Sequence, residues 1–214
     1  MIKAIIFDMY ETLVTLKSDE SFFGKDILRE LNIEEEKFNL WYEKEYERTV
    51  GILSLKDLLT LILEENNIYS DKLLNRIIEK RYEARRIPFK NLHPSIIPML
   101  KELKNEGIKI GLISNSFSEE VDTIKESLLF PYFDATCFSY EEHVMKPSDE
   151  IFERMISKLN LKYEECIYVG DGGSDELKAA KELGMKSLKA NWYINRDLNF
   201  EGLDDPLKVL SYVK

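Results

Sequence analysis

The chain has 214 residues, which is the length of one domain, or of one domain that carries an insert. Hydrophobic residues make up 44% of it, enough for a packed core, and this excludes disorder over any long stretch. The formal net charge of -10 disfavours a nucleic-acid backbone or an anionic membrane as the main partner, but a few local donors suffice to bind a small phosphorylated molecule.

The first predicted element is a strand over residues 2–7, an apolar run that ends at Asp8. This run is too short for a signal peptide or a membrane span, so we expect a cytoplasmic protein. Cys137 and Cys166 each lie in an apolar run that is typical of a strand. Buried reduced thiols are therefore expected, and no disulfide framework is indicated.

Residues 17–86 show almost no strand pattern and are rich in helical periodicity. One apolar stripe consists of Phe38, Trp41, Tyr42 and Tyr46, and a second of Leu55, Leu58, Leu59, Ile62 and Leu63. Stripes of this kind form a core more often than a ligand site. The segment is predicted to be a small helical bundle inserted after the first strand.

From Gly107 onward, short apolar runs alternate with amphipathic segments. The pattern predicts strands over 108–114, 133–139, 166–170 and 185–190, the last of the sheet. It predicts helices over 149–159, 175–183 and 119–129, the last with Val121, Ile124 and Leu128 on one face. Strands that alternate with helices imply crossover connections. We therefore expect an α/β fold, a Rossmann-like parallel sheet with helices on both faces.

Several polar residues follow these strands, and each has an ordinary explanation when taken alone. Asp8 lies at the carboxyl end of the first strand, where open α/β sheets bind ligands, but a turn residue has the same position. Ser114 and Asn115 end another strand, where a hydroxyl and a backbone N–H can hold a phosphoryl oxygen. Lys146 precedes Pro147 and can neutralise a carboxylate and a substrate oxyanion, although most lysines are solvated.

The most specific segment is Tyr-Val-Gly-Asp-Gly-Gly-Ser-Asp-Glu at residues 168–176. Asp171 and Asp175 stand four residues apart at a helix start and repel one another unless a cation lies between them. Oxygen ligands of this kind suit Mg²⁺. A helix capped by Ser174 accounts for Asp175 but not for Asp171 and the glycines together.

In chain order, these features resemble the haloacid dehalogenase superfamily. The matching stretches are Ile-Ile-Phe-Asp-Met-Tyr-Glu-Thr-Leu from residue 5, Leu-Ile-Ser-Asn from residue 112, Lys146-Pro147 and Gly-Asp-Gly-Gly-Ser-Asp-Glu from residue 170. The resemblance covers essentially the whole chain. It implies a core domain of residues 1–16 and 87–214 and an inserted α-helical cap of residues 17–86.

The resemblance also implies a Mg²⁺-dependent phosphatase that acts on a small phosphorylated metabolite, with no nucleic-acid or membrane partner, as a monomer or a homodimer. Asp8 is then the nucleophile that forms an aspartyl phosphate. Catalytic roles fall to Asp8, Tyr10 and Lys146, and substrate contacts to Thr12, Ser114, Asn115 and Lys146. The metal ligands implied are Asp8, the Tyr10 carbonyl and Asp171, with Asp175 orienting the ion or its waters.

Tyr10 departs from the phosphatase pattern, because family phosphatases usually have a general-acid aspartate there, worth about 10²–10⁴-fold in rate. Tyrosine is typical of 2-haloacid dehalogenases, whose halide leaves without a proton. Those enzymes usually lack the acidic metal loop and carry Leu-Trp-Arg in the cap, where this chain has Leu-Trp-Tyr from residue 40. Arg48 is the candidate replacement for that arginine.

The phosphatase is therefore the favoured interpretation, and a 2-haloacid dehalogenase-like hydrolase is the alternative. A catalytically weak relative that binds a phosphorylated ligand or transfers phosphate also stays open. Glu11 replaces the glycine that usually follows this tyrosine. It is a hypothetical substitute acid/base, although a surface residue at the edge of the site is the simpler interpretation.

Overall fold

Six parallel strands form the centre of the protein in a computed structural model that describes residues 1–17 and 21–213. Their order is β3-β2-β1-β4-β5-β6. The strands are β1 (Ala4–Phe7), β2 (Lys109–Ser114), β3 (Ala135–Phe138), β4 (Cys166–Gly170), β5 (Lys186–Ala190) and β6 (Gly202–Leu203). Because β1 pairs with both β2 and β4, the strand order reverses at its carboxyl end, which is where open α/β sheets place their ligands.

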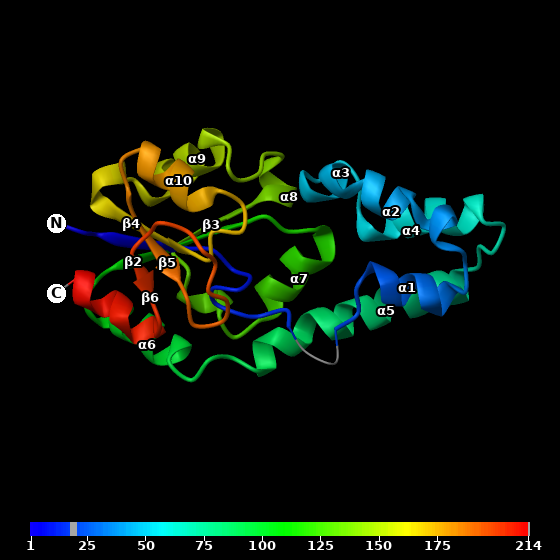
Figure 1. Ribbon diagram of the computed structural model, residues 1–214, viewed down its shortest axis with the longest axis horizontal. Helices are drawn as coiled ribbons and strands as arrows, with labels where there is room; N and C mark the ends of the chain where they lie inside the picture. Colours follow the sequence, from blue (N-terminus) through cyan, green and yellow to red (C-terminus); the bar gives the residue numbers. More distant parts are fainter. Residues whose placement is uncertain (18–20, 214) are drawn as a thin grey trace.

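Helices cover both faces of this sheet, which confirms the predicted Rossmann-like α/β fold (Figure 1). One face packs against α9 (Asp149–Leu159) and α10 (Glu176–Glu182), the other against α6 (Ile96–Asn105) and α7 (Ser118–Glu126). Alternate residues of β1 serve the two faces: Ile5 faces α6, and Ile6 faces α9. Every residue of β1 is fully buried, because both faces are covered.

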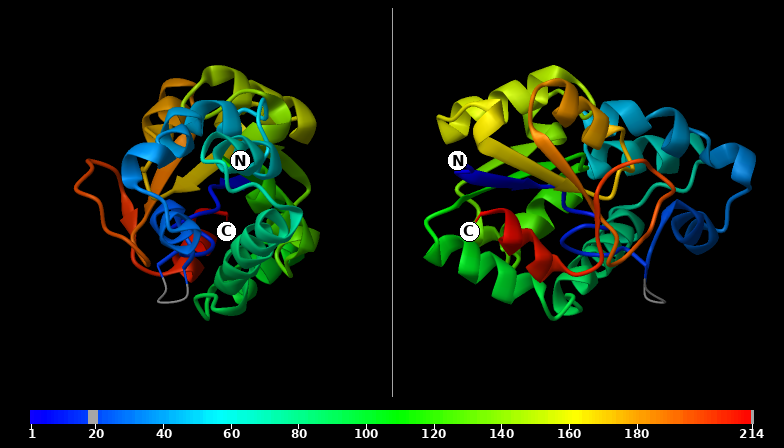
Figure 2. Two further views of the ribbon diagram at one scale, coloured as in Figure 1. Left: turned by 90° about the vertical axis from the view of Figure 1, so that its right-hand side faces the viewer. Right: turned by 60° about the vertical axis from the view of Figure 1, so that its left-hand side comes forward.

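The described part of the segment between β1 and α6 consists of helices, 3₁₀ turns and connecting loops, and its helices extend away from the sheet (Figures 1 and 2). It contains α1 (Gly24–Leu31), η1 (Glu35–Phe38), α2 (Leu40–Glu43), α3 (Glu45–Thr49), α4 (Leu55–Glu65), α5 (Asp71–Arg86) and η2 (Ile87–Lys90). We call residues 21–86 the helical insert. Residues 18–20 of the predicted 17–86 segment lie outside the described residues.

The helical insert has a hydrophobic core of its own, separate from the two cores on the sheet. In α4 the predicted stripe is confirmed, since Leu58, Leu59 and Ile62 are all fully buried. The helix begins with a capping box in which Ser54 Oγ accepts from the Asp57 N–H at 3.1 Å and Asp57 Oδ2 accepts from the Ser54 N–H at 3.2 Å.

The other predicted stripe divides. Phe38 and Trp41 are buried, but Tyr42 and Tyr46 are 45% and 62% exposed. The reason is that a 3₁₀ turn and two short helices replace the one continuous helix that the spacing requires.

Several predicted bounds differ from the observed ones by one or two residues, and two differences are larger. The helix predicted over 119–129 ends at Glu126, because Ser127 is extended, so Leu128 is 54% exposed and Leu129 is buried in its place. The strand predicted as the last of the sheet is β5, but β6 follows it and pairs through two residues only. A pair this short leaves no periodic pattern in the sequence.

The remaining elements lie in connections between strands and helices, except η5, which follows the last strand. They are η3 (Phe130–Tyr132), α8 (Ser139–Glu142), η4 (Tyr163–Glu165) and η5 (Pro206–Tyr212). Cys137 and Cys166 are both free and buried. Among the helices of the described residues, none has the length and apolar content that crossing a membrane requires. Both chain termini lie at the end of the sheet away from the helical insert (Figure 1).

Candidate active site

Asp8 is the centre of the site, at the carboxyl end of the central strand β1. It is 7% exposed, and its backbone N–H donates to the carbonyl of Val169 in β4 at 2.9 Å. Its Oδ1 accepts from Lys146 Nζ at 2.5 Å, and its Oδ2 accepts from Thr12 Oγ1 at 3.4 Å. The carboxylate is therefore held by two predicted site residues.

Lys146 is buried, and its position is fixed at both ends. Its Nζ also donates to Tyr168 Oη at 3.2 Å. Its backbone N–H donates to Asn115 Oδ1 at 2.8 Å, and its carbonyl accepts from Asn115 Nδ2 at 3.1 Å. Asn115 was predicted to contact substrate, and in the structure its side chain holds the lysine segment next to Asp8.

A cavity of about 210 Å³ opens over these residues. It is lined by Asp8, Tyr10, Glu11, Asn115, Lys146, Asp171, Gly173, Ser174 and Arg196. Ser114 and Thr12 do not line it. Ser114 is fully buried, and its hydroxyl pairs with the Ser116 hydroxyl at 2.7 Å, so its side chain supports the loop after β2.

Three buried carboxylates meet beside Lys146. Asp8, Asp171 and Glu176 each offer an oxygen atom within 4.8 Å of the other two. Burial raises the pKa of Asp8 to about 6, against the lowering effect of Lys146 and together with the raising effect of Glu176 and Asp171. Close, buried carboxylates with oxygen atoms only are a donor set that fits a hard cation such as Mg²⁺.

The sequence analysis did not identify Glu176 as part of this carboxylate group. It named Asp175 instead, and the structure does not bring Asp175 to the group. Asp175 has a left-handed backbone with φ of 55° and lines a separate depression with Pro147 and Lys178. That turn starts α10 so that the next side chain, Glu176, reaches the loop and accepts from the N–H groups of Gly172 and Ser174. The signal in the sequence was the second acidic residue, Glu176, directly after the predicted ligand Asp175.

Tyr10 packs against the hydrophobic core of the sheet, and the Glu11 carboxylate is hydrogen-bonded within its own turn. The Tyr10 hydroxyl is buried without a hydrogen-bond partner, and burial, aided by Glu120, raises its pKa well above the usual value of 10. Glu11 has φ of 57°, and its carboxylate accepts from Thr15 Oγ1 at 2.8 Å and the Leu16 N–H at 3.0 Å. The hypothetical role of Glu11 as an acid/base therefore competes with a role in closing this turn.

A buried group of charges lies between the helical insert and α7. Glu119 is fully buried and lies 3.3 Å from Arg48 Nη2 and 3.0 Å from Arg81 Nε, while Glu120 lies 3.0 Å from Arg85 Nε. The Arg48 guanidinium also lies between two aromatic rings, 4.0 Å from Trp41 and 3.9 Å from Phe117. Arg48, the candidate substrate arginine of the sequence analysis, is thus paired with Glu119.

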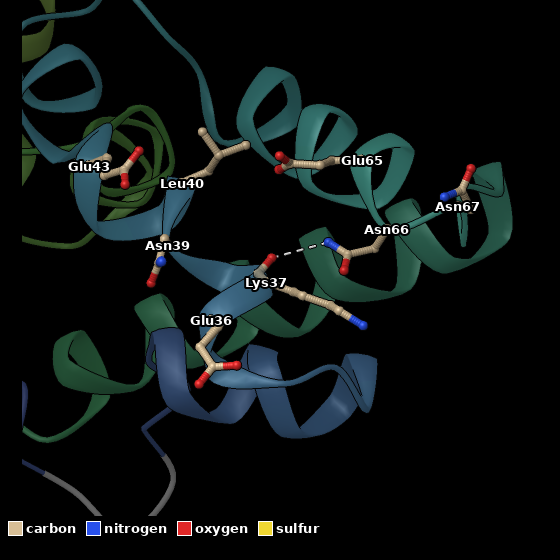
Figure 3. Close-up of a pocket in the computed structure, with 8 residues that line it drawn as sticks. All are labelled: Glu36, Lys37, Asn39, Leu40, Glu43, Glu65, Asn66 and Asn67. Atoms are coloured by element: carbon tan, nitrogen blue, oxygen red, sulfur yellow. Dashed lines mark hydrogen bonds between the residues drawn. The ribbon is translucent and has the colours of Figure 1, made fainter.

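A larger cavity, of about 450 Å³, lies at the outer end of the helical insert (Figure 3). Carboxylates and amides line much of it, and Asn66 Nδ2 donates to the Lys37 carbonyl across it at 3.1 Å. It comes from η1, α2 and the end of α4 and contains none of the residues around Asp8. The candidate active site is therefore the smaller cavity at the sheet.

Two solved structures share this architecture. A 2-haloacid dehalogenase from Pseudomonas syringae pv. Tomato DC3000 superposes with a TM-score of 0.75 at 19% identity, over 100% of this chain and 98% of the other. A HAD family enzyme from Bacteroides thetaiotaomicron, in complex with magnesium and inorganic phosphate, superposes with a TM-score of 0.69 at 20% identity, over 93% and 98%.

Sequence comparisons agree with these likenesses. The family model described as haloacid dehalogenase-like hydrolase matches residues 2–184. A glyceraldehyde 3-phosphate phosphatase from Methanocaldococcus jannaschii is 29% identical over 198 residues, which cover 88% of this chain and 85% of the other.

Proposed function

Because the chain belongs to the haloacid dehalogenase-like hydrolase family, we propose that it is a Mg²⁺-dependent phosphatase that hydrolyses a small phosphorylated metabolite through Asp8. The observation that carries the proposal is the pairing of Asp8 with Lys146 next to the carboxylates of Asp171 and Glu176. A nucleophilic carboxylate, a fixed cation and an acidic group for a metal are the parts that phosphoryl transfer through a covalent intermediate requires.

In the proposed reaction an Asp8 oxygen attacks phosphorus, and the bond from phosphorus to the substrate oxygen breaks. Water then attacks the aspartyl phosphate at phosphorus, which breaks the bond to Asp8 and releases inorganic phosphate. The leaving oxygen takes its proton from water in the cavity, since the Tyr10 hydroxyl is buried and its pKa is raised well above 10. Lys146 stabilises the negative charge on the transferring group.

The carboxylates of Asp8, Asp171 and Glu176 would hold the ion, and the Tyr10 carbonyl is the ligand that the family resemblance adds. A bound Mg²⁺ supplies positive charge that shields the nucleophile from the phosphate it attacks. Asp175 receives no role in this arrangement.

The helical insert is proposed as the cap of this site, which separates it from bulk water when substrate is bound. The paired charges of Arg48, Arg81 and Glu119 support this, since they join the insert to the core helix α7. Ser118 Oγ also accepts from the Leu55 N–H at 3.0 Å across the same boundary.

The proposal is tested by phosphate release from a panel of phosphate esters, with and without Mg²⁺. We expect Mg²⁺-dependent release by the wild type, and a loss on the order of 10³-fold or more for Asp8→Asn. Glu176→Gln should lose most of the activity, while its neighbour Asp175→Asn, the matched control, should keep it. Phosphate release by Asp8→Asn at the wild-type rate would contradict the proposal.

Tyr10 favours 2-haloacid dehalogenation as the second candidate, because halide needs no general acid. Its test is halide release from 2-chloropropionate by the wild type and by Asp8→Asn. Halide release without phosphate release would replace the phosphatase proposal. Release of neither would favour the ligand-binding alternative.

A further inference from the structure

We propose that Arg196 competes with the divalent cation for Asp171 and thereby weakens metal binding at the active site. The inference rests on the metal site of the proposed function. Arg196 is not part of any motif in the sequence, and it lies in the loop between β5 and β6. It lines the same cavity as Asp8, Lys146 and Asp171.

The first observation is the pairing itself. Arg196 Nε lies 2.9 Å and Nη2 2.8 Å from Asp171 Oδ2. The other oxygen, Oδ1, accepts from the Gly173 N–H at 3.0 Å. Both oxygens of Asp171 thus have donors, and two guanidinium N–H groups occupy one of them. A cation that takes a lone pair of Oδ2 must displace at least part of this pairing, and its charge repels the guanidinium.

The second observation is that a buried lysine, Lys189, holds the loop that carries Arg196. Lys189, at 6% exposure, donates its Nζ to the carbonyl of Arg196 at 2.6 Å and to that of Leu198 at 3.3 Å. It also donates to Asn195 Oδ1 at 3.3 Å. A buried lysine that holds three acceptors of one short loop fixes the backbone from which the arginine reaches Asp171.

The third observation explains the glycines of the acidic loop. A Cβ atom at Gly173 would lie 3.1 Å from Arg196 Nη2 and 3.1 Å from Asp171 Oδ1. A Cβ atom at Gly172, where φ is +86°, would lie 2.2 Å from Leu198 Cδ1. The two glycines therefore leave the space that the returning loop fills, and side chains there would push the arginine from its partner.

The fourth observation is that Arg196 is free to leave. Its side chain is 42% exposed, whereas that of Asp171 is 6% exposed. The guanidinium can therefore turn to water without opening the core, so its displacement has a modest energetic cost. Arg196 therefore lowers the affinity of the site for the metal ion without preventing the ion from binding.

The test is a calorimetric titration of Mg²⁺, without substrate, into the wild type and Arg196→Gln. We expect the Kd of the variant to fall about three- to tenfold, the range expected when a partly exposed charge pair and its repulsion are removed. Lys189→Met, which releases the loop, should also lower the Kd. Arg154→Gln is the matched control, since Arg154 is 38% exposed and pairs with Glu142 on another face.

The outcomes separate this inference from the proposed function. An unchanged or higher Kd in Arg196→Gln overturns the competition while leaving the metal site in place. Mg²⁺ binding that is absent from both proteins overturns the metal site and the competition together. A lower Kd in Arg196→Gln and an unchanged one in Arg154→Gln support the inference, because damage to the fold would weaken binding instead.

Discussion

Asp8 is the residue whose environment is most unusual, since one ammonium group and two carboxylates surround it in a buried site. Burial and the two carboxylates raise its pKa to about 6, in spite of Lys146. The proposed nucleophile must be ionised, and below this pKa the carboxyl group holds its proton. The environment therefore places the acid limit of the proposed reaction near pH 6.

We predict that kcat/KM for a phosphate ester falls as the pH drops through about 6, by about tenfold per pH unit below the Asp8 pKa. Because a bound cation lowers that pKa, a higher Mg²⁺ concentration should move the fall to lower pH. The measurement is a pH–rate profile from 4.5 to 8 at two Mg²⁺ concentrations.

The control for this profile is Glu11→Gln, which should leave the acid limb in place. The Glu11 carboxylate is bound to Thr15 and to the Leu16 N–H. If the acid limb disappears in that variant, Glu11 is the acid/base and Asp8 does not set the limb.

At this scale, contiguous motifs pointed the sequence analysis to Asp8, Lys146 and Asp171, and the structure brings the three side chains to one cavity. Asp8 and Asp171 directly follow the strands β1 and β4, whereas Lys146 lies in the loop after α8. The sequence analysis did not predict Glu176, because a left-handed turn at Asp175 decides which of two neighbouring acids faces the site. Nor did it predict Arg196, which the return of the chain after β5 brings to Asp171 from 25 residues away.

Among the elements, α7 of the core and the helices α3 and α5 of the insert are joined by buried charges. Although burial alone opposes ionisation, Arg81 and Arg48 hold the pKa of Glu119 below its usual value. Glu119 therefore stays ionised, and it neutralises one arginine from α3 and one from α5. We expect the paired charges to fix the position of the insert on α7, because an apolar surface would permit more packings than paired charges do.

Glu119→Gln should lower the free energy of unfolding by about 3–5 kcal/mol, because it leaves Arg48 and Arg81 buried without their counter-charge. The measurement is urea denaturation at pH 7. Glu126→Gln is the control, since that carboxylate is 55% exposed and pairs with Arg86, and it should change stability by less than about 1 kcal/mol. Equal losses of unfolding free energy in the two variants would show that the buried ion pairs stabilise the protein no more than the exposed one.

The elements that periodicity predicted best were long or fully buried. The helix Asp149–Leu159 and the strand Cys166–Gly170 have the predicted bounds, because a repeated apolar spacing defines them. The division of the first predicted helical stripe into the short helices α2 and α3 was not predicted, and neither was the strand β6. Elements of two to five residues carry too little periodic pattern to be recognised. Contacts from distant parts of the chain decide such elements.

At the scale of the whole molecule, the described residues form two hydrophobic cores on the sheet and a third in the helical insert. The buried residues of the third core all lie between Ile27 and Ile77, and the partly buried ones packed against it lie between Phe22 and Tyr82, so the core is formed within the insert. Parts with separate cores open separately, each with its own free energy.

Leu59→Ala should destabilise the helical insert by about 2–5 kcal/mol and speed amide exchange there more than in the sheet. Leu188→Ala, in β5, is the reciprocal change and should speed exchange in the strands first. Hydrogen–deuterium exchange followed by mass spectrometry resolves both regions. Uniform acceleration across the chain in both variants would mean that the molecule unfolds as one unit.

The two tryptophans of the chain are divided between these parts. Trp41 lies against the Arg48 guanidinium in the helical insert, and Trp192 donates its indole N–H to the Thr12 carbonyl at 2.7 Å, beside the loop that carries Asp8. Each indole is thus an intrinsic fluorophore for one part of the molecule. Trp41→Phe leaves an emission that reports on the active-site loops, and Trp192→Phe leaves one that reports on the insert. The rates at which the insert opens and the site rearranges can therefore be measured separately by intrinsic tryptophan fluorescence, without any attached dye.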